Sequence, residues 1–145
     1  QFPLVKGVET KAIESAPVTH AISGTVYLIE DIPEIRSVLE RELEMAGANV
    51  ISRADAIDAE DVIREYGDEI VLMIFDIDLP KRTGVECLTS LRSAGVHTPC
   101  LLITGGASQP PKIKRSAFLR KPFAPEMMFD SIQRLMDVEA NEYND

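Results

Sequence analysis

Four mostly apolar runs of the chain end in side chains that could handle a phosphoryl group or a metal ion. Glu30 and Asp31 follow the run TVYLI, and Asp76 closes the run IVLMIF. Thr104 ends the run CLLI, and Lys121 follows AFLR. A single acid is often a helix cap and a single lysine is usually a solvated surface charge. Their joint placement at the ends of four runs is harder to obtain by chance, and it points to one shared site.

The chemistry of such a site follows from its charges. Crowded carboxylates repel each other, and a hard divalent cation such as Mg²⁺, which prefers oxygen ligands, relieves that repulsion. Mg²⁺ and a lysine ammonium together offset the charge on the oxygens of a phosphoryl group in transfer. A carboxylate can then act as the nucleophile and form an aspartyl phosphate. The Thr104 hydroxyl could donate a hydrogen bond to a phosphoryl oxygen.

The elements that must position these residues alternate between strand and helix. Continuous apolar runs predict buried strands, and apolar residues at three- and four-residue spacing predict the helices between them. The predicted helices cover Pro33 to about Ala46, 59–66, Gly84 to Ala94 and the segment from Pro125 onward. Uniformly apolar strands that alternate with helices indicate a parallel sheet covered on both faces. The predicted fold class is therefore α/β, a doubly wound five-stranded parallel sheet, whose strand ends form the ligand edge.

Charge is distributed unevenly along the 145 residues, whose net charge is −9. Residues 25–86 carry 16 acidic and 6 basic side chains, whereas residues 87–125 carry 6 basic ones and no acidic one. The acidic surplus argues against direct nucleic-acid binding, and no apolar run is long enough for membrane insertion. Cys87 and Cys100 have apolar neighbours and no metal-binding context, so we expect core residues and a reducing, cytoplasmic compartment.

With these residues in view, the chain resembles the receiver domain of bacterial two-component response regulators over residues 25–138. The matching pieces are LIEDIPEIR, IFDIDLPKRTG, LLITG and FLRKPF, in the order of the family. Each piece is weak alone, and the four together are specific. The resemblance implies a flavodoxin-like sheet with strand order 2-1-3-4-5. Residues 1–24 would then be a linker or an added leader, and residues 139–145 an acidic tail.

The resemblance also implies a role for each site residue. Asp76 would accept a phosphoryl group from the phosphohistidine of a histidine kinase or phosphotransfer protein, and Lys121 would pair with that group. Thr104 would move toward the phosphoryl group, and Phe118 would follow as the aromatic switch residue read by a downstream protein. The family's cis peptide bond would precede Pro122. Mg²⁺ (or Mn²⁺) would be bound by Asp31, Asp76 and the backbone carbonyl of Asp78, with Glu30 helping to hold it through water.

The segment between Thr104 and Phe118 departs from the family's pattern. Its 13 residues include two glycines and two prolines, which resist helix formation, so the fourth helix is expected to be short or missing. This resembles a subgroup of receivers with a TGG or TGY signature, here ending at Gly106, and it puts the usual output face in doubt. Gly106 and Asp78 stand at positions expected to modulate the lifetime of the phosphoryl group.

Two alternatives from other functional classes stay open. A pseudo-receiver would share the fold and act as an interaction module that is never phosphorylated, although the complete residue set argues against it. A haloacid-dehalogenase-type phosphatase would use Asp76 as nucleophile and Asp78 as general acid. That family needs a further acidic pair after the lysine, whereas the next acid here, Glu126, opens a helix. We therefore expect a switch that phosphorylates and dephosphorylates itself rather than an enzyme.

Two kinds of parent protein are consistent with these residues. The chain suits a receiver within a hybrid histidine kinase, tethered in that case to a membrane-bound sensor. It equally suits a stand-alone regulator with added leader residues. Any kinase activity would lie in other parts of such a parent.

Asp78 lies two residues after Asp76, at a position where side chains would face the incoming water or phosphoryl group. An extra anion there should change the lifetime of phosphorylated Asp76. Replacing Asp78 by Asn should therefore alter the rate at which the acyl phosphate is lost after acetyl phosphate is removed. An unchanged rate would contradict this expectation.

Overall fold

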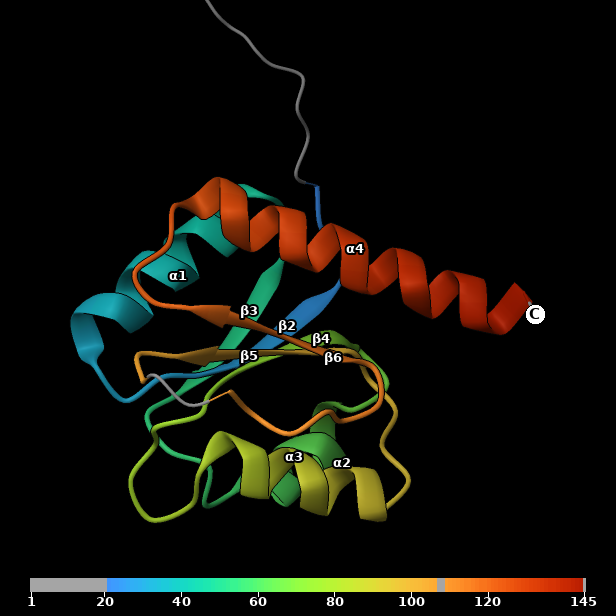
Figure 1. Ribbon diagram of the computed structural model, residues 1–145, viewed down its shortest axis with the longest axis horizontal. Coiled ribbons are helices and arrows are strands. Elements are labelled where there is room, and N and C mark those ends of the chain that lie inside the picture. Colours follow the sequence, from blue (N-terminus) through green and yellow to red (C-terminus); the bar gives the residue numbers. More distant parts are fainter. Residues whose placement is uncertain (1–20, 107–108, 145) are drawn as a thin grey trace, which may run out of the picture.

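Five apolar segments pair side by side into one parallel sheet in the computed structural model, which describes residues 21–106 and 109–144 (Figure 1). The strands are β2 (Thr25–Ile29), β3 (Asn49–Arg53), β4 (Ile70–Asp76), β5 (Cys100–Thr104) and β6 (Ser116–Arg120). They lie in the order β3-β2-β4-β5-β6, which is 2-1-3-4-5 when the five are counted along the chain. The predicted fold class and strand order are confirmed. Residues 1–20 of the predicted linker and residue 145 of the predicted tail lie outside the described residues.

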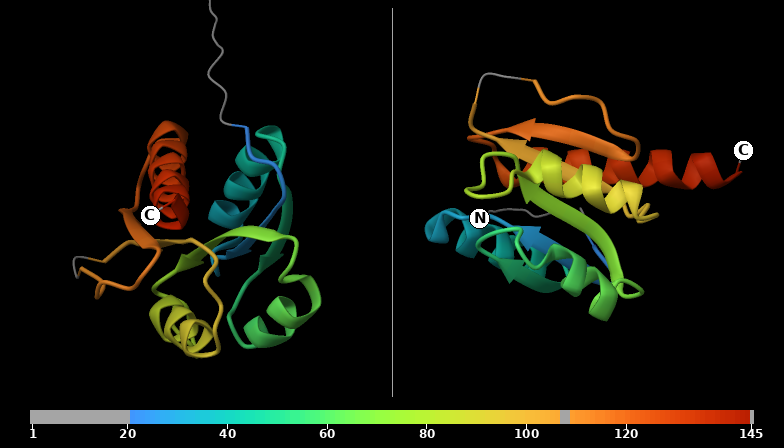
Figure 2. Two further views of the ribbon diagram at one scale, coloured as in Figure 1. Left: turned by 90° about the vertical axis from the view of Figure 1, so that its right-hand side faces the viewer. Right: turned by 90° about the horizontal axis from the view of Figure 1, so that it is seen from below.

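Four helices cover the two faces of the sheet in the described part of the chain. They are α1 (Pro33–Met45), α2 (Ala59–Tyr66), α3 (Gly84–Ser93) and α4 (Pro125–Asn144). α1 and α4 pack on one face, and α2 and α3 pack on the other (Figures 1 and 2). Pro33 and Pro125 occupy the first helical positions, where the missing amide proton costs no hydrogen bond. None of the described helices is long and apolar enough to cross a membrane.

The interior strand β2 shows how the sequence pattern fills both cores. Val26 and Leu28 pack into the core beneath α1 and α4, whereas Tyr27 and Ile29 pack into the core beneath α2 and α3. All four side chains are fully buried. A strand covered on both faces has no polar face, so its sequence is a continuous apolar run rather than an alternating one.

The connection from β5 to β6 contains no helix in its described residues, 105–106 and 109–115. Ile113 packs against the α2–α3 core, and the chain then returns to pair β6 with β5 in parallel. Arg92 at the end of α3 anchors this return, because its guanidinium donates to the carbonyl oxygens of Lys114 and Arg115 at 3.0 and 3.1 Å. The prediction that the fourth helix is short or missing is confirmed.

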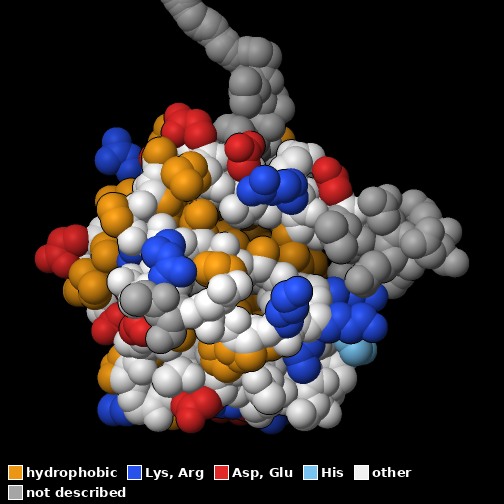
Figure 3. Space-filling view, in the orientation of Figure 1, with side chains coloured by type: hydrophobic (Ala, Val, Ile, Leu, Met, Phe, Trp, Pro, Cys, Tyr) orange, Lys and Arg blue, Asp and Glu red, His pale blue; other side chains and the backbone are white. Residues whose placement is uncertain are grey.

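The acid-free stretch of the sequence contributes to one face of the molecule. Lys112, Lys114 and Arg120 are exposed on or just before β6. Figure 3 shows basic side chains spread across the middle of this face, with acidic side chains toward its edges.

Arg82 ties the loop between β4 and α3 to helix α2. Its guanidinium donates to the two carboxylate oxygens of Glu60 at 2.8 and 2.5 Å, and to the carbonyl oxygen of Ala56 at 2.9 Å. The hydrogen bonds from Arg82 lower the pKa of Glu60 to about 2. Because this loop carries Asp78, the ion pair also restrains one of the predicted site residues.

At pH 7 we expect Glu60→Gln to lower the free energy of unfolding by about 1 kcal/mol. The bidentate pair with Arg82 strengthens the interaction, whereas solvent weakens it because the Glu60 side chain is 41 % exposed. The pKa of Glu60 is lower in the folded state than in the unfolded state. Its contribution is therefore complete above pH 4.5 and is lost as the pH falls toward 2. Urea unfolding should show a difference between wild type and variant that shrinks only as the pH falls from about 4.5 toward 2.

Asp61→Asn is the matched control on the same helix. It removes the Asp61–Arg64 pair, whose side chains are 74 and 73 % exposed, so it should change stability far less. Equal losses in the two variants, or a difference that does not depend on pH, would contradict the assignment of the Glu60–Arg82 pair.

Candidate functional site

The carboxyl ends of four neighbouring strands meet at one edge of the sheet. Ile29 at the end of β2 lies opposite Phe75 of β4. Asp76 lies opposite Ile103 of β5, and the amide of Lys121 donates to the Thr104 carbonyl at 2.7 Å just beyond β6. This register brings the predicted site residues to a common edge: Glu30, Asp31, Asp76, Thr104 and Lys121.

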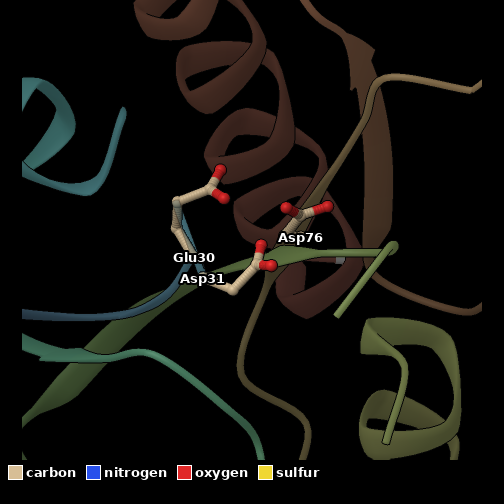
Figure 4. Close-up of side chains that lie close together, drawn as sticks. All are labelled: Glu30, Asp31 and Asp76. Atoms are coloured by element: carbon tan, nitrogen blue, oxygen red, sulfur yellow. The ribbon is translucent and has the colours of Figure 1, made fainter. Parts of the chain in front are cut away.

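Three carboxylates converge at this edge. One ligand oxygen from each of Glu30, Asp31 and Asp76 lies within 4.8 Å of the other two, and Figure 4 shows the three side chains directed toward one another. Glu30 and Asp76 are buried, whereas Asp31 is partly exposed. Burial raises the pKa of Glu30 to about 7, and the Asp76 carboxylate adds to the rise while Lys121 opposes it. The cluster thus carries an electrostatic strain that a bound cation would relieve.

Lys121 is the cation of this cluster. Its Nζ lies 2.9 Å from Glu30 Oε1 and 3.0 Å from Asp76 Oδ2. Burial alone disfavours the ammonium, but the hydrogen bonds to both carboxylates outweigh burial and raise the pKa of Lys121. The peptide bond between Lys121 and Pro122 is cis, as the resemblance predicted. The ammonium therefore stays charged beside Asp76 at neutral pH.

The Asp78 carboxylate links the loop after β4 to the end of β5. Its Oδ2 accepts hydrogen bonds from the Thr104 hydroxyl and the Gly105 amide, both at 3.2 Å. The Gly106 amide donates to Thr104 Oγ1 at 3.0 Å, and the Asp78 amide donates to Asp76 Oδ1 at 2.9 Å. The sequence predicted that Asp78 and Gly106 stand near the site, but it held no signal for their shared contact with Thr104.

Phe118 lies at the surface of β6, where its side chain is 37 % exposed. The guanidinium of Arg120 lies 5.8 Å from the centroid of the ring and also donates to the Gly106 carbonyl. The predicted switch aromatic therefore faces outward in this structure. It is connected through Arg120 to the segment that follows Thr104.

Arg36 of α1 supports the acidic cluster, a role that residue type and spacing did not indicate. Its guanidinium donates to the Glu30 carbonyl at 2.8 Å, and the Ile32 amide donates to Glu30 Oε2 at 3.1 Å. Ile32 and Arg36 both lie in the motif LIEDIPEIR, and that shared motif was the sequence feature that could have pointed to their contacts with Glu30. These contacts orient the backbone and carboxylate of Glu30 as the chain leaves β2.

The two cysteines lie away from this edge. Cys87 and Cys100 are free and buried, and burial raises the pKa of each thiol. Their thiols are therefore protonated at neutral pH, as expected of core residues.

The sequence model of the response regulator receiver domain family matches residues 26–133. This chain belongs to that family. Receiver domains are the phosphorylation-controlled switches of two-component signal transduction, and they bind Mg²⁺ at an acidic pocket. They interact with histidine kinases or phosphotransfer proteins and with downstream effectors. The sequence-based identification of a receiver domain is confirmed, whereas the roles of single residues and the domain limits stay predictions.

Curated relatives are longer proteins that contain a similar domain. The C4-dicarboxylate transport transcriptional regulatory protein DctD of Pseudomonas aeruginosa is 30 % identical over 118 residues, which cover 78 % of this chain and 25 % of that protein. The transcriptional regulatory protein CpxR of Escherichia coli is 29 % identical over 116 residues, which cover 77 % of this chain and 48 % of that protein. The receiver domain thus spans at most about half the length of these relatives.

Solved receiver structures share the fold. A response regulator receiver domain protein from Clostridium thermocellum superposes with a TM-score of 0.71 at 20 % identity, covering 81 % of this chain and 97 % of that one. The receiver domain of the hybrid histidine kinase CckA superposes with a TM-score of 0.66 at 26 % identity, covering 77 % of this chain and 98 % of that one.

Gly84 allows α3 of this receiver domain to begin directly against the strand end that carries Asp76. A Cβ atom on Gly84 would lie 2.4 Å from the Asp76 carbonyl oxygen and 3.2 Å from the Ile77 Cα. Both neighbours are backbone atoms, so neither can turn aside as a flexible side chain would. The glycine thus sets how closely the helix approaches the site.

We expect Gly84→Ala to lower the free energy of unfolding by about 1–3 kcal/mol, because the added methyl group forces the backbone of the receiver domain apart. Urea unfolding measures the loss. Gly105→Ala is the control, since a Cβ atom there meets nothing within 4 Å and the amide that bonds Asp78 is kept. A Gly84 variant as stable as the Gly105 variant would refute the close approach.

Proposed function

We propose that this receiver domain switches when Asp76 accepts a phosphoryl group from the phosphohistidine of a histidine kinase or phosphotransfer protein. The observation that carries the proposal is the environment of Asp76. Its side chain is 2 % exposed at the sheet edge, lies 3.0 Å from the Lys121 ammonium and belongs to a cluster of three carboxylates. A poorly solvated nucleophile with a fixed cation beside it is arranged for transfer of an anionic group.

Mg²⁺ (or Mn²⁺) fits the donor set at this edge. Glu30, Asp31 and Asp76 offer hard oxygen ligands, and Lys121 balances only part of their charge. These three residues and the backbone carbonyl of Asp78 would hold the ion. When bound, the ion supplies positive charge to the oxygens of the transferred group.

The covalent step exchanges one bond to phosphorus for another. An oxygen of the Asp76 carboxylate attacks the phosphorus atom, the bond from phosphorus to the imidazole nitrogen breaks, and the imidazole leaves with the electron pair. Lys121 already touches Asp76 Oδ2, so its ammonium can pair with the new phosphoryl oxygens without a large movement. Hydrolysis of the acyl phosphate by water resets the switch, with Asp78 and Gly106 modulating its rate.

Phosphorylation would act on a two-state element at the ends of β5 and β6. The Thr104 hydroxyl would turn to the phosphoryl oxygen, and Phe118, which faces outward in this structure, would follow. A downstream protein would read the altered face. The phosphatase alternative has no support in the geometry, because the Asp78 carboxylate that would be its general acid accepts hydrogen bonds from Thr104 and Gly105.

With Mg²⁺ and acetyl phosphate, intact-protein mass spectrometry should detect one phosphoryl adduct on the wild type and none on Asp76→Ala. Chelating the metal before acetyl phosphate is added should prevent the adduct, because the carboxylate cluster then lacks the charge that offsets the phosphoryl oxygens in transfer. Asp68→Asn is the control, since Asp68 is exposed in the turn before β4, at the opposite end of that strand. An equal adduct on Asp76→Ala, or none on any protein, would overturn the phosphoacceptor assignment.

A further inference from the structure

The Asp78 carboxylate contacts the same hydroxyl that the phosphoryl group would need. Asp78 Oδ2 lies 3.2 Å from Thr104 Oγ1 and 3.2 Å from the Gly105 amide nitrogen. The Asp78 amide in turn donates to Asp76 Oδ1, so the backbone of Asp78 lies against the nucleophile while its carboxylate contacts Thr104 and Gly105. An anion supplied by the protein itself therefore already uses the donors at the end of β5.

We propose that Asp78 is an internal competitor of the phosphoryl group, which holds Thr104 in the unphosphorylated arrangement until Asp76 is phosphorylated. The inference rests on the proposed function, in which Thr104 donates to the phosphoryl group. A threonine hydroxyl has a single proton to donate. The Gly106 amide donates to Thr104 Oγ1, so that contact uses a lone pair of the hydroxyl oxygen and not its proton. Asp78 and the phosphoryl group therefore compete for the one hydroxyl proton. Thr104 can donate its hydrogen bond to only one of the two anions at a time.

Charge makes the exchange directional. A phosphoryl group adds negative charge next to the Asp78 carboxylate, and like charges at close range repel. The group that takes the Thr104 proton therefore also drives Asp78 away from Thr104 and Gly105. Once Asp78 is displaced, the Gly105 amide loses its acceptor as well, and the segment after β5 is released at two points.

The released segment is connected to the surface of β6. A Cβ atom on Gly105 would meet nothing within 4 Å, so the segment is open on the side where a side chain would stand. Arg120 donates to the Gly106 carbonyl and lies over the Phe118 ring. Displacement of Asp78 can therefore alter the position of Phe118 through the Gly106–Arg120 hydrogen bond and the Arg120–Phe118 cation–π contact. The described residues of this connection contain no helix.

Competition differs from simple repulsion of the phosphoryl group by the Asp78 charge, because only competition requires the Thr104 hydroxyl. A double-mutant cycle separates the two: wild type, Asp78→Ala, Thr104→Val and the double variant are titrated with beryllofluoride in excess Mg²⁺. We expect Asp78→Ala to tighten beryllofluoride binding roughly fivefold or more in the wild-type background. In the Thr104→Val background the same substitution should tighten binding clearly less, because only the charge repulsion remains to be removed.

Equal tightening in both backgrounds would show that Asp78 acts by charge alone, and no tightening in either would show that it does not oppose the phosphoryl group. Either result overturns the proposal while leaving the phosphoacceptor assignment intact. Beryllofluoride that fails to bind the wild type, or that binds Asp76→Ala equally well, would instead defeat the proposed function and the competition together.

The contact itself is tested without any ligand. In the free protein, Asp78→Ala should speed hydrogen exchange of the Gly105 amide and shift its resonance, because that amide loses its acceptor. Asp68→Asn removes an exposed carboxylate remote from the site and should leave the Gly105 amide unchanged. A Gly105 amide that does not respond to Asp78→Ala would overturn the proposal, whatever the ligand titrations show.

Discussion

The structure depends on the burial of two carboxylates, Glu30 and Asp76, beside each other at the edge of an apolar sheet. Removing two anions from water is costly, and placing them side by side adds repulsion. The Lys121 ammonium, within 3.0 Å of both, offsets part of that cost. The lysine reaches them only because β6 pairs with β5 and ends at the same edge as β2 and β4. The arrangement is thus held by sheet topology, since its own electrostatics would push the acids apart.

The short β5–β6 connection must hold β6 beside β5, so that Lys121 reaches the two carboxylates. Where a crossover helix would normally cover the sheet, Arg92 binds the backbone at the entrance to β6, and Arg120 binds the Gly106 backbone at its exit. In the described residues of this connection, individual hydrogen bonds and the packing of Ile113 take the place of a helix. Such contacts can be exchanged one at a time, whereas a packed interface moves as a unit. The competition between Asp78 and the phosphoryl group is an exchange of this kind.

Most of the fold and the membership of the site were predictable from sequence, because both follow from local patterns. Continuous apolar runs can be buried on both faces only within a covered parallel sheet, and the ends of such strands share one edge. The glycines and prolines after Thr104 excluded a full helix there. Partners could not be predicted in this way. Arg82 binds Glu60 and Thr104 binds Asp78 across more than 20 residues of sequence, through side-chain rotamers that only the packed loops select.

The sequence by itself determined that acids, a hydroxyl and a lysine would converge at the strand ends, because the side-chain pattern dictates strands and parallel strands align their ends. Only the tertiary structure decided which of these groups touch. Lys121 lies between Glu30 and Asp76, Asp78 turns to Thr104, and Phe118 faces outward beside Arg120. The physical reason is distance. Hydrogen bonds and ion pairs act over about 3 Å, and differences on that scale arise from loop conformation and packing that residue type and spacing do not encode.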